Sequence, residues 1–319
     1  MRAVRALLLS IALGSAVFAR APEAEATEPH AASPELAAPP AAFDRWRGLS
    51  FGSDLAPKSS FVAQDGGVDV VFHFHAGQMA ERQMKESGMN AVFVSCGYGI
   101  GSGAYADALA SPQRFGNMLD ELVRNLETQT GAKKGTLHVR KLALASWSAG
   151  FAAVGKILGV DRYYAMVDSV VLNDSLHSQY IDPNPKTASQ GAERVDLKMM
   201  RSFIRFAKDA AAGQKTMVIT HSAIIPPDYA SSSEATQALL TAIQVPSTAV
   251  DETSDAHWRA MTLVKTADAG NLHVRGFKGR GPRDHFQHLY VLGEVLRSWV
   301  APRWKREDRL VYTLASEQL

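Results

Sequence analysis

Short apolar runs, rich in β-branched and aromatic residues, recur along most of the chain. Longer segments in which apolar residues fall at helical spacing separate these runs. Runs of this length that are apolar throughout are typical of strands buried on both faces of a sheet. The predicted strands are residues 68–75, 90–95, 137–146, 169–172, 216–220 and 272–277.

Helical spacing and capping residues characterise the segments between these strands. Residues 78–87 predict a helix that ends at Gly88, and Ser111 and Pro112 supply an N-cap and a first turn for the next helix. That second helix carries Phe115, Met118, Leu119, Leu122 and Leu126 on one side. Further helices are predicted after Gly150, over 195–206, after Ser231 and over 286–300. Strands that alternate with helices predict an α/β fold with a doubly wound, mostly parallel sheet flanked by helices.

Two long connections interrupt this alternation. Residues 180–195 contain the turn Asp182-Pro183-Asn184-Pro185, and residues 225–271 separate the last two predicted strands. Connections of this length in α/β proteins are commonly functional, as lids or substrate walls. We therefore expect cap or lid insertions at both places.

The N-terminus has the pattern of a secretory signal peptide. Residues 1–5 include Arg2 and Arg5, and the apolar run over 6–18 is too short for an ordinary membrane span. Small residues follow, so cleavage is predicted after Ala19, with an uncleaved interfacial helix or membrane anchor as the alternative. The expected location is secreted or periplasmic, without stable membrane insertion once residues 1–19 are removed.

The segment after the predicted signal peptide has a different composition. Residues 20–45 are dominated by Ala, Pro and Glu, which is typical of a linker without regular structure. The α/β domain is then expected over residues 46–319. This length is sufficient for one large hydrophobic core.

Composition narrows the class of protein. The chain of 319 residues is 46% hydrophobic and 21% charged, which is ordinary for a globular protein. Its 34 basic and 32 acidic residues give a formal net charge of +2, so a nucleic-acid partner is not indicated. Cys96 is the single cysteine, which excludes intramolecular disulfides and zinc sites built from several thiolates. An exported domain without disulfides has to be stabilised by its core.

The most informative chemical motif lies where the predicted strand at 137–146 ends. It reads Ser146-Trp147-Ser148-Ala149-Gly150, and a helix of small residues follows. A serine at a sharp strand-to-helix turn is forced out of the sheet, and only small side chains fit two positions before and after it. Ser148 is therefore the candidate nucleophile. Because the following helix directs its first backbone N–H groups toward this point, the N–H of Ala149 is a candidate oxyanion donor.

A second motif ends the first predicted strand, with the residues His73-Phe74-His75-Ala76-Gly77. This segment resembles the His-Gly oxyanion segment of the α/β-hydrolase family. The resemblance implies that Ala76 or Gly77 presents a second backbone N–H to the oxyanion. For the two histidines, packing or hydrogen bonding on one face of the strand is the simpler interpretation.

Acid and base residues extend the resemblance to the rest of the domain. Asp284 and His285 stand at a loop-to-helix junction after the last predicted strand, where α/β-hydrolases carry the catalytic histidine; His288, one helical turn later, is the alternative. Asp174 directly follows the strand at 169–172, at a place where the family carries its acid. Asp228, beyond the next strand, is the alternative acid.

The order Ser148, Asp174, His285 is that of the α/β-hydrolase family, although Ser146 stands where the family usually has glycine. The resemblance implies a serine hydrolase of the esterase or lipase type that cleaves a carboxylic ester, or an amide, through an acyl-enzyme on Ser148. The expected substrate is a small-molecule or polymeric ester or amide, and no cofactor or metal is implied. Trp147 either shapes the acyl pocket or packs behind the turn.

Other functions stay open from the residues alone. His73, His75 and His285, together with Asp174, would support a metal-dependent hydrolase if they converged at one sheet edge. A noncatalytic binding protein on a hydrolase fold is a further alternative.

The glycines at positions 97, 99, 101 and 103 partly match a dinucleotide-binding fingerprint. Ser111 and Pro112 interrupt the helix that this fingerprint requires, so nucleotide binding is disfavoured. We expect instead a flexible loop at the mouth of the site, where Tyr98 and Tyr105 contact substrate.

Overall fold

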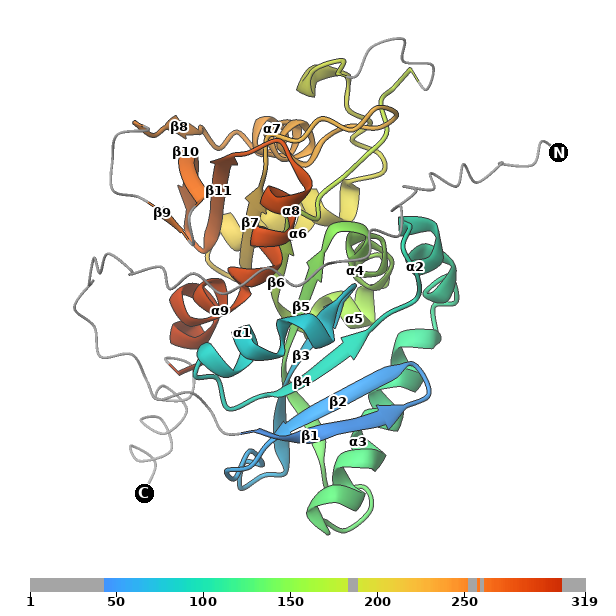
Figure 1. The fold of residues 1–319 in the computed structure, drawn as a ribbon. Helices are drawn as coiled ribbons and strands as arrows, with labels where there is room; N and C mark the ends of the chain where they lie inside the picture. The colour runs from blue at the N-terminus through green and yellow to red at the C-terminus, as the bar shows by residue number, and fades with distance from the viewer. Residues whose placement is uncertain (1–42, 183–188, 252–256, 259–260, 306–319) are drawn as a thin grey trace, which may run out of the picture. The chain divides into compact units, whose positions relative to one another are not determined.

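The computed structural model of the chain describes residues 43–182, 189–251, 257–258 and 261–305 (Figure 1). The predicted signal peptide, residues 1–19, and most of the predicted linker lie outside these residues. Strand β1 (Phe43–Leu49) begins within the range assigned to the linker, because the Phe43 side chain packs into the core. Among the described residues, no helix is long and apolar enough to cross a membrane.

A mostly parallel sheet forms the centre of the domain. Its parallel strands lie side by side in the order β4 (Val92–Cys96), β3 (Gly67–Phe74), β5 (His138–Trp147), β6 (Val167–Asn173), β7 (Thr216–His221) and β11 (Leu272–Lys278). Each of these strands was predicted from its apolar run, with slightly different ends. Because they run parallel, their carboxyl ends lie at one edge of the sheet, where ligands bind in such folds.

Antiparallel strands complete both sides of the sheet. At one side, β2 (Gly52–Pro57) pairs with β4, and β1 pairs with β2. At the other side, β10 (Met261–Ala269) pairs with β11 and carries the short strands β8 (Thr248–Ala249) and β9 (His257–Trp258). The prediction of a lid over 225–271 was therefore wrong for β10. This strand is only half buried and contains charged residues, so its sequence lacks the continuous apolar run of the central strands.

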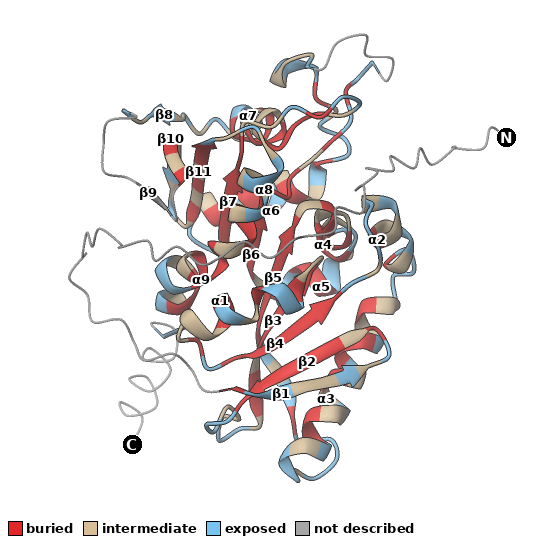
Figure 2. Ribbon diagram, in the orientation of Figure 1, coloured by how far each residue is buried: buried red, intermediate tan, exposed pale blue. Residues whose placement is uncertain are grey.

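Helices cover both faces of the sheet (Figures 1 and 2). One face packs against α2 (Ser102–Ala108), α3 (Arg114–Thr130), α4 (Phe151–Leu158), α5 (Asp161–Met166), α6 (Arg201–Ala211) and α7 (Ser232–Ala242). The opposite face packs against α1 (Glu81–Glu86), α8 (Pro282–Tyr290), α9 (Leu292–Val295) and the π-helical turn η4 (Leu296–Val300). Alternate strand residues supply the two cores, as Val70 and Phe72 face the first group and Val71 the second. This arrangement confirms the predicted doubly wound fold.

The helices differ from the predictions in detail. The last helix, expected over 286–300, begins at Pro282 and is divided into α8, α9 and η4. Here α9 lies so close to α1 that a Cβ atom on Gly293 would be 2.5 Å from the carbonyl oxygen of Gln83. Residues expected to form a flexible glycine-rich loop include helix α2. The helix expected from Ser111 begins at Arg114 and buries the predicted apolar residues.

The connection after β6 is attached to α7. The Glu234 side chain completes a capping box with Ser231 and also accepts hydrogen bonds from the Tyr180 hydroxyl and the Gly191 N–H. A 3₁₀ turn, η3 (Ala192–Arg194), lies in the same connection, and residues 183–188 are outside the described part. One carboxylate thus ties both ends of this connection to the first turn of α7.

Candidate active site

Ser148 has the backbone conformation of a sharp strand-to-helix turn. It follows the last residue of β5 and has a φ of 52°, in the left-handed region that non-glycine residues rarely adopt. The 3₁₀ turn η2 (Ser148–Gly150) leads directly into α4. Strain of this kind persists only where the surrounding structure imposes it and is concentrated at functional sites.

The residues two positions on either side of Ser148 explain how this turn is held. A Cβ atom on Gly150 would lie 2.2 Å from the carbonyl oxygen of Phe74, so glycine allows the turn to contact β3. The buried Ser146 hydroxyl lies 2.8 Å from the Ser175 hydroxyl, which also donates to the carbonyl of Ser148 at 2.8 Å. Ser146, which departs from the usual glycine, therefore takes part in a hydrogen-bond chain that holds the turn.

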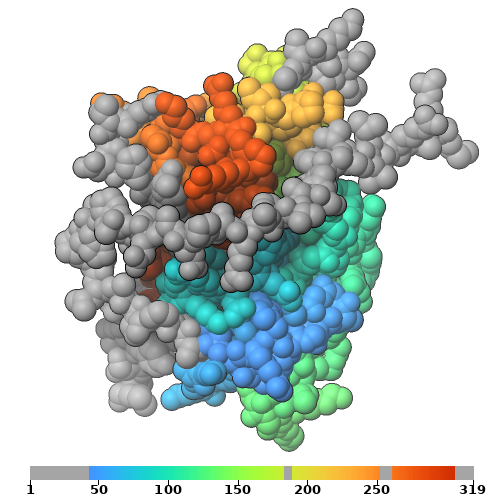
Figure 3. Space-filling view, in the orientation of Figure 1, coloured from blue at the N-terminus to red at the C-terminus, as the bar shows by residue number. Residues whose placement is uncertain are grey.

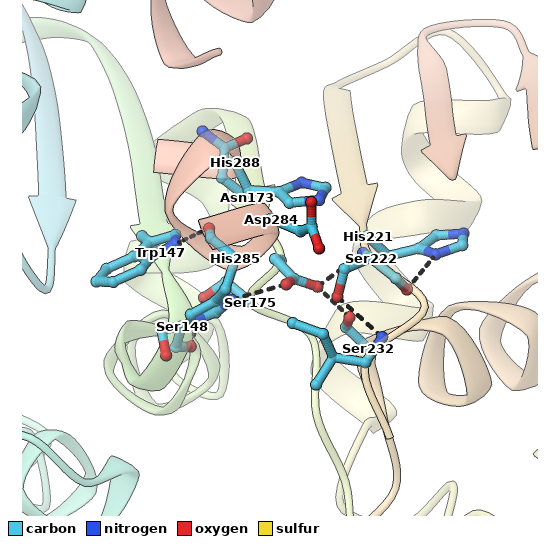
Figure 4. Close-up of polar contacts among 12 residues, drawn as sticks. Trp147, Ser148, Asn173, Ser175, His221, Ser222, Ser232, Asp284, His285 and His288 are labelled. Atoms are coloured by element: carbon cyan, nitrogen blue, oxygen red, sulfur yellow. Dashed lines mark hydrogen bonds and ion pairs between the residues drawn. The ribbon is translucent and has the colours of Figure 1, made fainter. Parts of the chain in front are cut away.

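His285 and Asp174 are joined across the carboxyl edge of the sheet. His285 is in the first turns of α8, and its Nδ1 lies 2.7 Å from Oδ2 of Asp174, which follows the last residue of β6. Figure 4 shows His285 beside Ser148 and Trp147. Among the described residues no hydrogen bond joins the Ser148 hydroxyl to His285, and such bonds are often long before substrate binds.

Asp174 is buried and has a full set of donors. Its Oδ1 accepts from the Ser222 N–H at 2.9 Å and from the Ser232 hydroxyl at the start of α7. Burial raises the pKa of the Asp174 carboxyl, but attraction to His288 and the hydrogen bonds from His285 and Ser222 outweigh it and hold this pKa well below its usual value. The carboxylate is therefore ionised at neutral pH.

Trp147 lies between two histidines. Its indole stacks on the His285 ring with centroids 4.6 Å apart and on the His75 ring with centroids 5.2 Å apart. The indole N–H also donates to the backbone carbonyl of His285 at 2.9 Å (Figure 4). His75 is held in turn by the Tyr105 hydroxyl, 2.8 Å from its Nδ1.

The segment predicted to donate to the oxyanion turns sharply after β3. His75 and Ala76 have φ values of 73° and 56°, and Ala76 precedes the 3₁₀ turn η1 (Gly77–Ala80). A Cβ atom on Gly77 would be 2.7 Å from the Ser95 hydroxyl, so this glycine permits close approach to β4. A cavity of about 650 Å³ adjoins Ala76 and Gly77 and is also lined by residues of β1 and β2. Those strands are blue, and the segment after β3 is cyan, in Figure 3.

The alternative acid and base lie in different surroundings. His288 is buried with Nδ1 2.8 Å from the Thr220 hydroxyl, and burial lowers its pKa to about 4. Asp228 is exposed in the segment between β7 and α7, whereas Asp174 is the carboxylate bonded to His285. Among the predicted site residues, the structure thus brings together His285 and Asp174 near Ser148.

The proposed metal ligands do not converge. No group of three or more His, Cys, Asp or Glu side chains suited to a metal ion occurs in the described residues. His73 is buried against Phe93, and burial lowers its pKa to about 3, whereas His75 bonds Tyr105. The metal-dependent alternative through His73, His75 and His285 lacks a supporting geometry within these residues.

The glycine-rich segment after β4 also differs from expectation. Tyr105, expected to contact substrate, is 1% exposed, and its hydroxyl bonds His75, the Tyr98 N–H and the Gly99 carbonyl. It is therefore connected to the site through its hydrogen bond with His75. Cys96 ends β4 and is buried, and burial raises the pKa of its thiol, so this group is not a reactive thiolate.

Several contributing residues were not found from the sequence. Ser175 follows Asp174 and could have been noticed beside that motif, but Ser222 acts through its backbone and Ser232 through a helix end distant in sequence. Their roles depend on β6, β7 and α7 meeting at one place. No local pattern contains that information.

Comparisons with known proteins give a general likeness. No protein-family model and no curated protein sequence matches the chain. Among solved structures, the poly(3-hydroxybutyrate) depolymerase LpqC of Bordetella parapertussis is 13% identical, with 77% of this chain and 81% of that chain covered and a TM-score of 0.41.

Two further solved structures are similar to the same extent. An esterase of Pyrobaculum calidifontis is 14% identical, with 84% of this chain and 87% of the esterase covered and a TM-score of 0.40. The acylaminoacyl peptidase of Pyrococcus horikoshii is 10% identical, with 81% of this chain but 41% of the peptidase covered and a TM-score of 0.42. Likeness at this level does not assign an activity, which has to be inferred from the site.

Proposed function

We propose that this protein is an exported serine hydrolase of the α/β-hydrolase type that cleaves a carboxylic ester, or an amide, through an acyl-enzyme on Ser148. One observation carries the proposal: a serine in the left-handed conformation directly follows β5, beside a histidine that is hydrogen-bonded to a buried carboxylate. A nucleophile, a base and a group that orients the base are the parts that acyl transfer requires.

In the first half of the reaction, the Ser148 hydroxyl attacks the carbonyl carbon of the substrate and His285 takes the hydroxyl proton. The Nδ1–H of His285 donates to Asp174, which leaves the other ring nitrogen free to accept this proton. The tetrahedral oxyanion accepts hydrogen bonds from the Ala149 N–H and from the N–H of Ala76 or Gly77. His285 then protonates the departing alcohol or amine, and the acyl group stays on Ser148.

In the second half, water replaces the leaving group. His285 removes a proton from the water as it attacks the acyl carbonyl, and a second tetrahedral intermediate forms. Its collapse releases the carboxylic acid and returns the proton to Ser148. The negative charge of Asp174 favours the imidazolium that forms in both halves.

Labelling with a fluorophosphonate tests this proposal directly. The Ser148 hydroxyl should displace fluoride from the reagent, and mass spectrometry of the digested protein should locate the adduct on Ser148. The Ser148→Ala variant should lose both labelling and hydrolysis of aryl esters. As a control, Ser111→Ala, at an exposed position, should keep both.

The other functional classes predict different results. An unlabelled protein whose hydrolytic activity is lost with a chelator would indicate a metal-dependent enzyme. An unlabelled protein without hydrolytic activity would indicate a noncatalytic binding protein. Either result would contradict the role proposed for Ser148.

Export is supported by the basic and apolar pattern of residues 1–18. When the full chain is produced in a bacterial host, we expect a periplasmic or secreted protein whose first residue is Arg20. Mass spectrometry of the intact protein measures this. A full-length protein that sediments with membranes would instead support the anchor.

A further inference from the structure

We propose that Trp147 is a positioning residue that fixes the His285 ring and stabilises its protonated form during turnover. This inference rests on the proposed function of Ser148 and His285 and adds the indole ring of Trp147 to the site. Trp147 directly precedes the candidate nucleophile, and its side chain contacts His285 in two ways.

The first contact orients the backbone that carries the base. The indole N–H donates to the carbonyl oxygen of His285 at 2.9 Å, which joins the end of β5 to α8 across the sheet edge (Figure 4). Trp147 is buried, with 5% of the residue exposed, so water competes little for this donor. The bond restrains the start of α8, and with it the place from which the imidazole extends.

The second contact orients the ring itself. The indole and imidazole planes differ by 30° and their centroids are 4.6 Å apart, so the imidazole lies over the indole face. The Asp174 carboxylate holds the Nδ1 of the same ring. The Asp174 contact lies in the plane of the imidazole, and the Trp147 contact lies against its face. Together the two contacts determine the direction and the tilt of the imidazole ring.

Trp147 is itself supported from behind. His75 stacks on the indole with an interplanar angle of 20°, and the Tyr105 hydroxyl holds the Nδ1 of His75. Burial lowers the pKa of His75, so this ring stays neutral at neutral pH. A neutral ring can support the indole without repelling a positive charge on His285.

The charges around His285 favour a cation there. Asp174 is the anion bonded to it. Electrostatic interactions also reach His285 from His75, His177 and His288, and burial lowers the pKa of each of these three groups. These histidines are therefore mostly neutral at neutral pH. Under these conditions an aromatic face stacked on imidazolium adds a cation–π attraction that it does not offer to neutral imidazole.

This preference of the indole for protonated His285 affects kcat more than KM. His285 is neutral when substrate binds and becomes protonated in the transition state. An interaction that is stronger in the transition state than in the ground state raises kcat and leaves KM almost unchanged. Loss of the Trp147 ring should therefore lower kcat.

Three variants test the inference. Trp147→Leu removes the aromatic face and the N–H, and kcat should fall by about 10- to 30-fold with KM changed less than about twofold. Trp147→Phe restores an aromatic face without the N–H and should recover part of this loss. Trp299→Phe is the matched control, because Trp299 also stacks on a histidine, His273, with centroids 5.0 Å apart, and should leave kcat unchanged.

The pH profile distinguishes positioning from a general loss of structure. Without the ring, protonated His285 is less stable, so the acidic limb of the kcat/KM profile should move to lower pH in Trp147→Leu and less in Trp147→Phe. The inference would be overturned if Trp147→Leu raised KM and left the pH profile unmoved, and if Trp147→Phe lost as much kcat as Trp147→Leu.

A measurement without turnover separates this inference from the proposed function. Protonated histidine quenches the fluorescence of a stacked indole, so acidification should dim the wild-type protein more than Trp147→Phe or His285→Gln. If fluorophosphonate does not label Ser148, the proposed function is wrong. The fluorescence difference tests the stacking of Trp147 on His285 independently of that result. Equal dimming in all three proteins would contradict the stack.

Discussion

Asp174 receives more hydrogen bonds than its contact with His285 alone requires. The Ser222 N–H and the Ser232 hydroxyl bond the oxygen that does not face His285. Its own backbone has a φ of 46°, and its N–H donates to the Thr220 carbonyl at 2.8 Å. Both the backbone and the side chain of this residue are therefore held by β7 and α7, and the carboxylate has one available orientation.

Replacing this carboxylate tests its role. Asp174→Asn keeps the size of the side chain but removes its charge, so imidazolium on His285 loses its counterion. We expect kcat/KM for an aryl ester to fall by roughly 10³- to 10⁴-fold at pH 7. Asp228→Asn, at an exposed position, should leave kcat/KM unchanged. The assignment would be wrong if Asp228→Asn abolished turnover while Asp174→Asn did not.

At the scale of elements, the site depends on how closely β5 and α4 approach β3. The turn at Ser148 passes over the end of β3, where Gly150 leaves no room for a Cβ atom beside the Phe74 carbonyl. The segment that follows β3 in turn supplies Ala76 and Gly77 to the same edge. One close backbone contact therefore sets the spacing between the candidate nucleophile and a candidate oxyanion donor.

Gly150→Ala tests this contact. The added methyl group should push the turn away from β3, with a loss of about 1–3 kcal/mol in the free energy of unfolding and a larger relative loss of kcat. Urea denaturation and aryl-ester kinetics measure the two effects. Gly103→Ala in α2 is the matched control, since a Cβ atom there meets nothing within 4 Å, and it should unfold at an equal or slightly higher urea concentration. Equal stability of both variants would show that the close contact between Gly150 and the Phe74 carbonyl does not exclude a methyl group.

At the scale of the whole molecule, neutral histidines are part of the core. His73 is fully buried on β3, and neither ring nitrogen has a hydrogen-bond partner within the described residues. Burial lowers the pKa of His73 to about 3 and that of His288 to about 4. The folded protein thus excludes protons that the unfolded chain binds below a pH of about 6.5.

This difference predicts a loss of stability in acid. Above pH 6.5 these histidines are mostly unprotonated in both the folded and the unfolded state, so they cause no pH dependence of the free energy of unfolding. As the pH falls from about 6.5 toward 3 to 4, the unfolded state gains protons and the free energy of unfolding drops by up to about 1.4 kcal/mol per pH unit for each group.

Urea denaturation at pH 7 and pH 5 measures this drop. His73→Leu should reduce it, because the unfolded chain then has one fewer histidine to protonate. His138→Leu, at an exposed position of β5, is the control and should leave the drop unchanged. An identical pH dependence in wild type and His73→Leu would contradict the prediction.

Much of the fold could be predicted because its signals are local. The apolar runs that became β3 to β7 and β11 are continuous in sequence, since strands buried on both faces need apolar residues at every position. The strands β1 and β10 were missed because they are only partly buried and include charged residues. Strand β2 is mostly buried, but glycine, serine, aspartate and proline leave it without a continuous apolar run. Helix α2 was missed because its glycines favoured a loop.

The sequence by itself determined the class of fold, the turn at Ser148 and the chain order of serine, aspartate and histidine, because each depends on neighbouring residues. Only the tertiary structure decided that His285 bonds Asp174 and not Asp228, that Ser175 holds the turn, and that Trp147 lies between His75 and His285. These contacts join β3, β5, β6 and α8, which are far apart along the chain. They form because a parallel sheet brings the carboxyl ends of its strands to one edge.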